Sequence, residues 1–131
     1  MSRTRGADEV EHYLAAVVER EPQESECLVC FVDRMVAEFG CDSSLLWATR
    51  FRDLRSPTAT ALEKRFLAKA VRCDCLVLQK AYQPVRELMV RDVHTDDLER
   101  PRRMPPCAGV RRTNTRPCAH WERGFMANYP D

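Results

Sequence analysis

Apolar residues recur every three or four positions through residues 7–82, a spacing that predicts amphipathic helices. No segment of residues 7–90 alternates between apolar and polar residues in the manner of a strand. Polar or proline-containing breaks divide the pattern into five predicted helices. Their apolar positions are Val10, Leu14, Val17 and Val18; Leu28, Phe31, Val32, Met35 and Phe39; Leu46, Trp47, Phe51 and Leu54; Leu62, Phe66, Leu67 and Ala70; and Leu76, Leu78 and Tyr82. We therefore expect an all-α fold, a small bundle of about five helices formed by residues 7–90.

Residues that favour capping stand where several of these helices should begin. Ser25 is the expected N-cap of the second helix, and Asp42 or Ser43 is the expected N-cap of the third. Asp74 is the expected N-cap of the fifth helix. Pro84 interrupts the fifth helix, and the segment that follows it is a candidate continuation of that helix.

Residues 91–131 differ in composition from the helical part of the chain. They contain five of the eight prolines, and within residues 100–123 their arginines are opposed only by Glu122. They also contain more large apolar residues than a disordered tail usually does. The arginines are Arg100, Arg102, Arg103, Arg111, Arg112, Arg116 and Arg123. We expect an irregular C-terminal extension that packs partly on the domain formed by residues 7–90.

The composition favours a cytoplasmic protein. Residues 1–10 carry four charged side chains and no apolar core, so they do not resemble a signal peptide. No run approaches the roughly 18 apolar residues of a membrane-spanning helix. The chain has seven cysteines, an odd number, and the cytoplasm keeps thiols reduced. These cysteines are therefore expected in a metal site or in redox chemistry rather than in a disulfide framework.

Two cysteine pairs are the strongest candidates for a metal site. Cys27 and Cys30 share one face at the start of the second predicted helix, and Cys73 and Cys75 precede the fifth. Structural zinc is held in a tetrahedron of four sulfur or nitrogen ligands, so two such pairs can complete one site. Cys41 is the expected substitute if one of the four is not used. Free packed cysteines, a redox dithiol at Cys27 and Cys30, and an iron–sulfur cluster are the alternatives.

The order of these cysteine motifs along the chain also resembles that of a known family. The order C-x-x-C, then Phe39-Gly40-Cys41-Asp42, then Cys73-Asp74-Cys75 is similar to that of a family of small uncharacterised actinobacterial proteins. Those proteins share a domain of unknown function, and the similarity spans roughly Cys27 to Tyr82. The family commonly has glycines just before the C-D-C element, where this chain has Ala70-Val71-Arg72. The resemblance implies that the cysteines act as one set, and it implies no activity.

The extension offers a second candidate site at Cys107, Cys118 and His120. Two thiolates and an imidazole could hold zinc with a fourth ligand from elsewhere in the chain. A disulfide between Cys107 and Cys118 is one alternative, and free packed side chains are the other. The candidates for the fourth ligand are His94, His12 and Cys41.

The sequence favours a binding function over an enzymatic one. Four glycines exclude a P-loop and a dinucleotide fingerprint, and no zinc-protease or zinc-deaminase motif is present. We expect a protein-interaction or regulatory module with a structural zinc, and no membrane partner. Nucleic acid is an alternative partner through Arg111, Arg112 and Arg116, and a thiol-based redox or metal sensor is the other alternative. The formal net charge of +1 instead favours pairing of the arginines with acidic residues of the first two helices.

Overall fold

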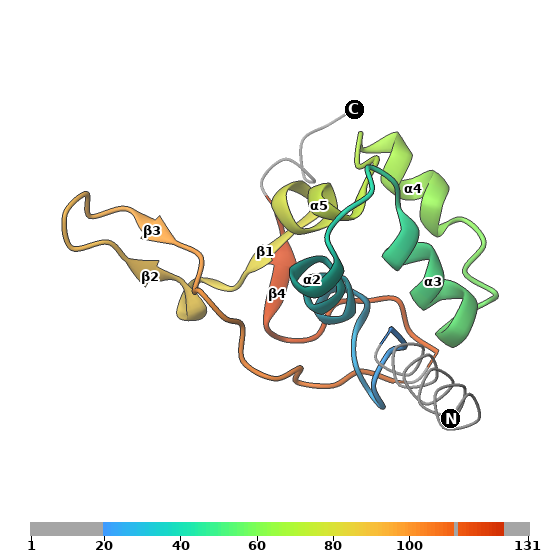
Figure 1. The fold of residues 1–131 in the computed structure, drawn as a ribbon. Coiled ribbons are helices and arrows are strands. Elements are labelled where there is room, and N and C mark those ends of the chain that lie inside the picture. The colour runs from blue at the N-terminus through green and yellow to red at the C-terminus, as the bar shows by residue number, and fades with distance from the viewer. Residues whose placement is uncertain (1–19, 112, 125–131) are drawn as a thin grey trace, which may run out of the picture.

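The structure, a computed structural model, describes residues 20–111 and 113–124. Helix α2 (Leu28–Phe39) lies at its centre and contacts α3 (Leu46–Arg55). Helix α4 (Leu62–Ala68) packs on α3, and the short helix α5 (Asp74–Leu76) continues into a π-helix, Val77–Ala81, that returns to α2 (Figure 1). The predicted first helix, and with it His12, lies outside the described residues.

The core forms around the apolar face of α2. Leu28, Val29, Phe31, Val32 and Met35 are buried on this helix. The ring of Phe31 contacts two aromatic rings of α3, with centroids 6.4 Å from Trp47 and 5.9 Å from Phe51. Full burial of such side chains contributes about 1.5–3 kcal/mol each. Four positions assigned to the buried faces are instead more than a third exposed, namely Phe39, Leu46, Leu54 and Leu67.

The expected all-α fold is wrong, because the part of the chain that the structure describes contains four short strands in two antiparallel sheets. Strand β1 (Tyr82–Pro84) pairs with β4 (Trp121–Arg123), with Pro84 opposite Trp121. The segment after Pro84 does not continue a helix beyond a single 3-10 turn, Arg86–Leu88. Strands of three residues are too short to show alternation in a sequence, and the partner of β1 lies about forty residues further along the chain.

The β1–β4 sheet joins the extension to the helical part of the chain. Gly124 continues the pairing by donating its amide to the Ala81 carbonyl at 2.9 Å. A Cβ atom at Gly124 would lie 2.4 Å from the Lys80 carbonyl oxygen, so only glycine allows this approach without a shift of backbone. The extension therefore contributes a strand to the core region as well as irregular segments.

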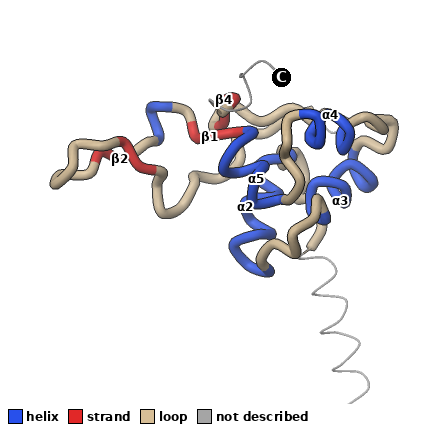
Figure 2. The backbone as a smooth tube through the Cα atoms, turned by 90° about the horizontal axis from the view of Figure 1, so that it is seen from above, coloured by secondary structure: helices blue, strands red, loops and turns tan. Residues whose placement is uncertain are grey.

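A second pair of strands forms a hairpin that projects from the rest of the molecule. Strand β2 (Val90–Arg91) pairs with β3 (Leu98–Glu99), and Figures 1 and 2 show the hairpin extending away from the helices. Its turn is held by the Asp92 carboxylate, which accepts from the amides of His94 and Thr95. The hairpin carries the exposed apolar residues Val90, Val93 and Leu98.

The N-terminal caps differ from those expected. The N-cap of α2 is Cys27 rather than Ser25, which has a positive φ of 62°. Helix α3 receives no cap from Asp42 or Ser43. Asp74, expected to cap the fifth helix, instead accepts hydrogen bonds from the amides of Trp47 and Ala48 in the first turn of α3, at 2.9 Å and 3.0 Å. A carboxylate at this position satisfies free amides and the positive end of the helix dipole.

The turn before the C-D-C element is a Schellman motif at the end of α4. The amide of Ala70 donates to the Leu67 carbonyl, and the amide of Val71 donates to the Phe66 carbonyl. Buried Val71 and Phe66 provide the apolar pair typical of the motif. Ala70 has a φ of 60°, a conformation in which glycine is favoured. The structure thus uses the left-handed geometry for which glycine is suited, although the chain has alanine there.

Replacing Ala70 by glycine should therefore stabilise the protein. The cost of left-handed alanine is about 1–2 kcal/mol, and the added freedom of glycine in the unfolded chain offsets about half of it. We expect an increase of about 0.5–1 kcal/mol in the free energy of unfolding, measured by urea denaturation. Ala68→Gly, inside the same helix, is the matched control and should lower stability by about 1 kcal/mol. A loss of stability in both variants would contradict the strain assigned to Ala70.

Among the described residues, no helix combines the length and the apolar composition needed to cross a membrane.

Candidate metal centre

Two of the candidate ligands stand at the N-terminus of the central helix. Cys27 is the N-cap of α2, and Cys30 lies in its first turn. The Cys30 amide donates to the Cys27 sulfur at 3.3 Å, so Cys27 caps the helix with its thiol instead of a hydroxyl or carboxylate. The helix thereby presents both sulfurs on one side, at the positive end of its dipole. This environment favours thiolates.

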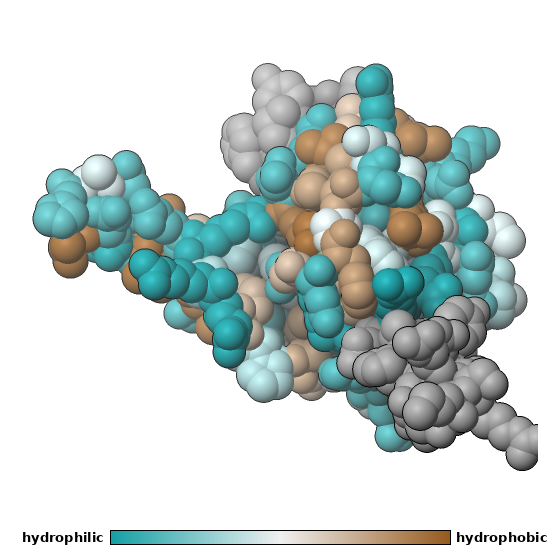
Figure 3. Space-filling model, viewed as in Figure 1, coloured by the Kyte–Doolittle hydropathy of each residue, from teal (hydrophilic) through white to brown (hydrophobic). Residues whose placement is uncertain are grey.

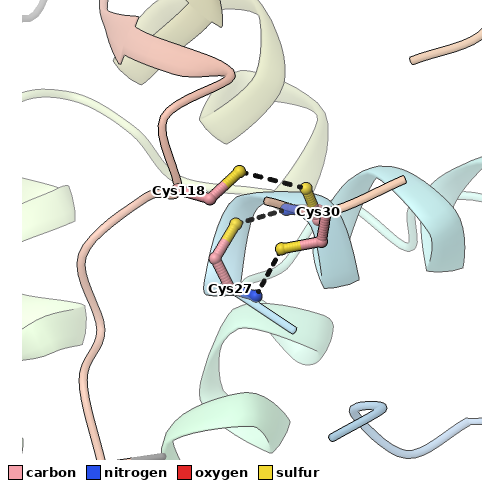
Figure 4. Close-up of side chains that lie close together, drawn as sticks. Cys27, Cys30 and Cys118 are labelled. Atoms are coloured by element: carbon pink, nitrogen blue, oxygen red, sulfur yellow. Dashed lines mark hydrogen bonds between the residues drawn. The ribbon is translucent and has the colours of Figure 1, made fainter. Parts of the chain in front are cut away.

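The extension supplies two further cysteines to the same place. The amide of Val110 donates to the Ser25 carbonyl at 2.9 Å, which fixes the segment containing Cys107 beside the start of α2. Cys118 lies just before β4, and its carbonyl accepts from the Trp121 amide in a tight turn. Pairing of β4 with β1 then places this turn against the helices. Figure 4 shows the side chains of Cys27, Cys30 and Cys118 pointing toward one another.

The four sulfurs have the spacing of a tetrahedral metal site. The Sγ atoms of Cys27, Cys30, Cys107 and Cys118 all lie within 4.8 Å of one another. Cys30 and Cys118 are 3.7 Å apart, sulfur to sulfur. In a regular tetrahedron with zinc–sulfur bonds of about 2.3 Å, the sulfurs are about 3.8 Å apart. A metal ion would fit between them with small adjustments of side chains.

Hydrogen-bond donors surround the sulfur atoms. Cys107 accepts from the Cys27 amide at 3.2 Å and from the Gly109 amide at 3.4 Å. Gly109 has a φ of 92°, the left-handed region that glycine adopts without strain. The indole nitrogen of Trp121 donates to the Cys30 sulfur at 3.2 Å. Such outer contacts orient ligands and disperse the negative charge of a tetrathiolate.

The thiols of the cluster differ in acidity. The hydrogen bond from the Cys30 thiol, together with amide and Cys118 contacts, lowers the pKa of Cys27 from its ordinary value of 9.0 to about 6 despite burial. The same pairing with Cys27, added to burial, raises the pKa of Cys30. Burial also raises the pKa of Cys107. One thiolate is thus available at neutral pH, and at least two protons remain for a metal to displace.

The zinc affinity of the cluster should therefore rise with pH. Each proton displaced by the metal changes affinity by about tenfold per pH unit, while its thiol remains protonated in the free protein. Because Cys30 and Cys107 each lose a proton to the metal, the zinc affinity should rise by about a hundredfold or more between about pH 7 and pH 8. Cys27 adds to this slope only below its pKa of about 6. Competition with a chromophoric chelator at several pH values measures the zinc affinity. An affinity that hardly changes with pH would contradict the protonation states assigned to these thiols.

The structure groups the cysteines differently from the sequence prediction. Cys27 and Cys30 lie with Cys107 and Cys118, and Cys73 and Cys75 are not members of this group. The difference has a physical reason. Cys73 is the N-cap of α5, and its neighbour Asp74 is held by the first turn of α3, so the C-D-C element faces the start of α3. Metal binding by Cys73 and Cys75 stays a prediction.

Cys41, Cys73 and Cys75 form a second, smaller group of thiols. Burial acts to raise the pKa of Cys41, but hydrogen bonds from the amides of Cys75 and Ser43 and from the thiols of Cys75 and Cys73 outweigh it and lower the pKa. The pKa of Cys75 is raised to about 11, chiefly by its contact with Cys41. The structure thus places Cys41 with the C-D-C element and not with the extension.

The other predictions made for the extension have different outcomes in the structure. All seven cysteines are free, so the alternative disulfide between Cys107 and Cys118 is not formed. His120 is not a member of the four-sulfur group; its Nδ1 atom is buried and has no hydrogen-bond partner. His94 lies in the turn of the β2–β3 hairpin. Trp121, which the sequence did not mark as a site residue, contacts a candidate ligand directly.

A comparison with known protein families finds a match for the central part of the chain. A family model described as a protein of unknown function (DUF2695) matches residues 28–79. The expected resemblance to a domain of unknown function is confirmed at this level. The matched segment contains Cys30, Cys41, Cys73 and Cys75, whereas Cys27, Cys107 and Cys118 lie outside it. No curated protein and no solved structure matches the chain.

Proposed function

We propose that this protein is a small structural zinc module, in which Cys27, Cys30, Cys107 and Cys118 bind one Zn²⁺. The observation that carries the proposal is the gathering of four sulfurs within 4.8 Å of one another from segments about eighty residues apart. Four sulfur ligands in a tetrahedron are typical of structural zinc sites and of iron–sulfur proteins. Zinc is favoured because sulfurs within 4.8 Å of one another suit a single ion, and zinc is the usual single ion of a structural four-cysteine site.

The proposed role of the metal is to fasten the extension to the helical part. Two of its ligands belong to α2, and the other two belong to the extension before and after residues 108–117. Between these ligands the extension contacts the helical part, for example where Ser56 Oγ donates to the Thr113 carbonyl at 2.8 Å. A metal that closes so long a loop stabilises the folded state by a large amount, because an unfolded chain does not hold the site together.

A fastened extension would present the β2–β3 hairpin as a contact surface for another protein. Val93 is 91% exposed at its turn, and Val90 and Leu98 are also exposed. Figure 3 shows some apolar surface, drawn brown, on the otherwise mostly hydrophilic projecting arm. Exposed apolar side chains gathered on one projection favour an interaction role over an enzymatic one.

Native mass spectrometry of the full chain, purified without added metal, tests the proposal. The expected result is one zinc ion per chain, whose removal by a chelator increases hydrogen exchange in residues 101–124. Elemental analysis of the same sample identifies the metal. A chain that carries no metal and does not take up zinc at neutral pH would overturn the proposal, and iron in place of zinc would overturn the choice of metal.

A further inference from the structure

A second feature of the extension lies on the side of α4. A cleft of about 560 Å³ opens between α4, strand β1 and residues 115–117 of the extension. Its size is in the range of pockets that bind small molecules. The residues that line it are Leu62, Arg65, Phe66, Ala68, Lys69, Ala81, Tyr82, Thr115, Arg116, Pro117 and Arg123.

The charged residues of this cleft all have the same sign. Arg65 and Lys69 come from α4 and its end, and Arg116 and Arg123 come from the extension, with no carboxylate in the lining. Three arginines outside the cleft, Arg34, Arg52 and Arg91, form ion pairs with acidic residues of the described part of the chain. The four cations of the cleft make no side-chain hydrogen bond or ion pair within residues 20–111 and 113–124. Four unneutralised cations around one hollow repel each other, and a polyanion would relieve that repulsion.

The rest of the lining is apolar and contains an aromatic ring. Tyr82 is half-buried in the lining, and both Arg65 and Arg123, which also line the cleft, interact electrostatically with its phenol. Leu62, Phe66 and Pro117 add apolar surface. A ligand that fits both parts needs negative charge for the cations and a flat apolar portion for the ring.

We propose that this cleft binds a small molecule with two or more phosphate groups and an aromatic base, that is, a nucleoside di- or triphosphate. Arginine forms paired hydrogen bonds with phosphate oxygens, and four cations exceed what a single carboxylate can neutralise. A cleft of about 560 Å³ suits one nucleotide better than a polymer, which needs an extended basic track. Cys118 directly follows Pro117, so the metal centre described above would hold the Arg116 side of the cleft in place.

Isothermal titration of the zinc-loaded full chain with adenosine triphosphate and with inorganic pyrophosphate tests this proposal. We compare Arg65→Ala/Lys69→Ala with the control Lys64→Ala/Arg72→Ala, which removes the same charge near the same helix but outside the cleft. The cleft variant should bind both ligands with an affinity about tenfold or more below that of the wild type, and the control variant should lose less than about threefold. The zinc content of each variant is measured in parallel and should equal that of the wild type.

Three results would overturn the proposal. The first is no binding of either ligand to zinc-loaded protein. The second is an equal loss in both double variants, which would indicate general charge attraction. The third is tighter binding of a single-stranded oligonucleotide than of the triphosphate, with loss of affinity in both variants, which would assign the arginines to a nucleic-acid surface. In all three cases retained zinc leaves the proposed metal centre standing.

Discussion

Replacing Cys118 by serine is expected to remove tight zinc binding and to release the extension from the helices. Cys118 is a buried member of the four-sulfur group, 3.7 Å from Cys30. Changes to outer contacts of metal sites weaken metal binding by about 10–100-fold, and loss of a ligand should exceed that range. A hundredfold loss of affinity corresponds to about 2.7 kcal/mol of stability when the metal is in excess. Competition with a chelator and urea denaturation in zinc-containing buffer measure the two effects.

Cys73→Ser is the matched control for this prediction. It also removes one cysteine, and serine is a good N-cap residue at Cys73, the N-cap position of α5, where the cysteine side chain makes no capping hydrogen bond. The account predicts zinc affinity equal to that of the wild type and stability within about 0.5 kcal/mol. Zinc lost from Cys73→Ser but retained by Cys118→Ser would restore the pairing suggested by the sequence motifs and contradict the site described above.

Replacing Asp74 by alanine should produce the second large effect, a loss of about 2–4 kcal/mol in the free energy of unfolding. The carboxylate is fully buried and accepts from the amides of Trp47 and Ala48, so alanine leaves two buried donors unpaired. It also removes a link between α5 and α3. Burial raises the pKa of Asp74, and the two amides offset this only in part. Urea denaturation of zinc-loaded protein measures the loss.

Asp42→Ala provides the comparison for Asp74. Asp42 is also an acidic residue near the start of α3, but it is exposed and bonds only to Ser44 nearby. We expect Asp42→Ala to lower the free energy of unfolding by less than about 1 kcal/mol. Equal losses in the two variants would show that the cap of α3 is not specific to Asp74.

The sequence predicted the helices better than their connections. The second predicted helix has a strong apolar stripe and a glycine at its end, and α2 ends at Phe39 as expected, although it begins after Cys27 rather than after Ser25. The strands β1 and β4 could not be predicted because each has three residues and finds its partner only when the chain folds. The cap of α3 was missed for the same reason, since Asp74 lies 27 residues from Trp47.

Half of the candidate metal centre could be predicted from local spacing. A C-x-x-C at a helix N-terminus places two sulfurs on one face, and the structure does so with Cys27 and Cys30. The positions of the other two sulfurs depend on the path of the extension, which no local pattern defines. Cys107 and Cys118 were identified as candidates, but with His120 and as a separate site. Cys73 and Cys75 were the other predicted pair, yet Asp74 between them binds to α3 and directs that element elsewhere.

X-ray absorption at the zinc edge of the full chain, compared with the double variant Cys73→Ser/Cys75→Ser, tests the central claim most directly. The account predicts four sulfur ligands at about 2.3 Å in both proteins, because all four ligands come from Cys27, Cys30, Cys107 and Cys118. A first shell that loses sulfur in the double variant, or that contains a nitrogen ligand in the wild type, would contradict it.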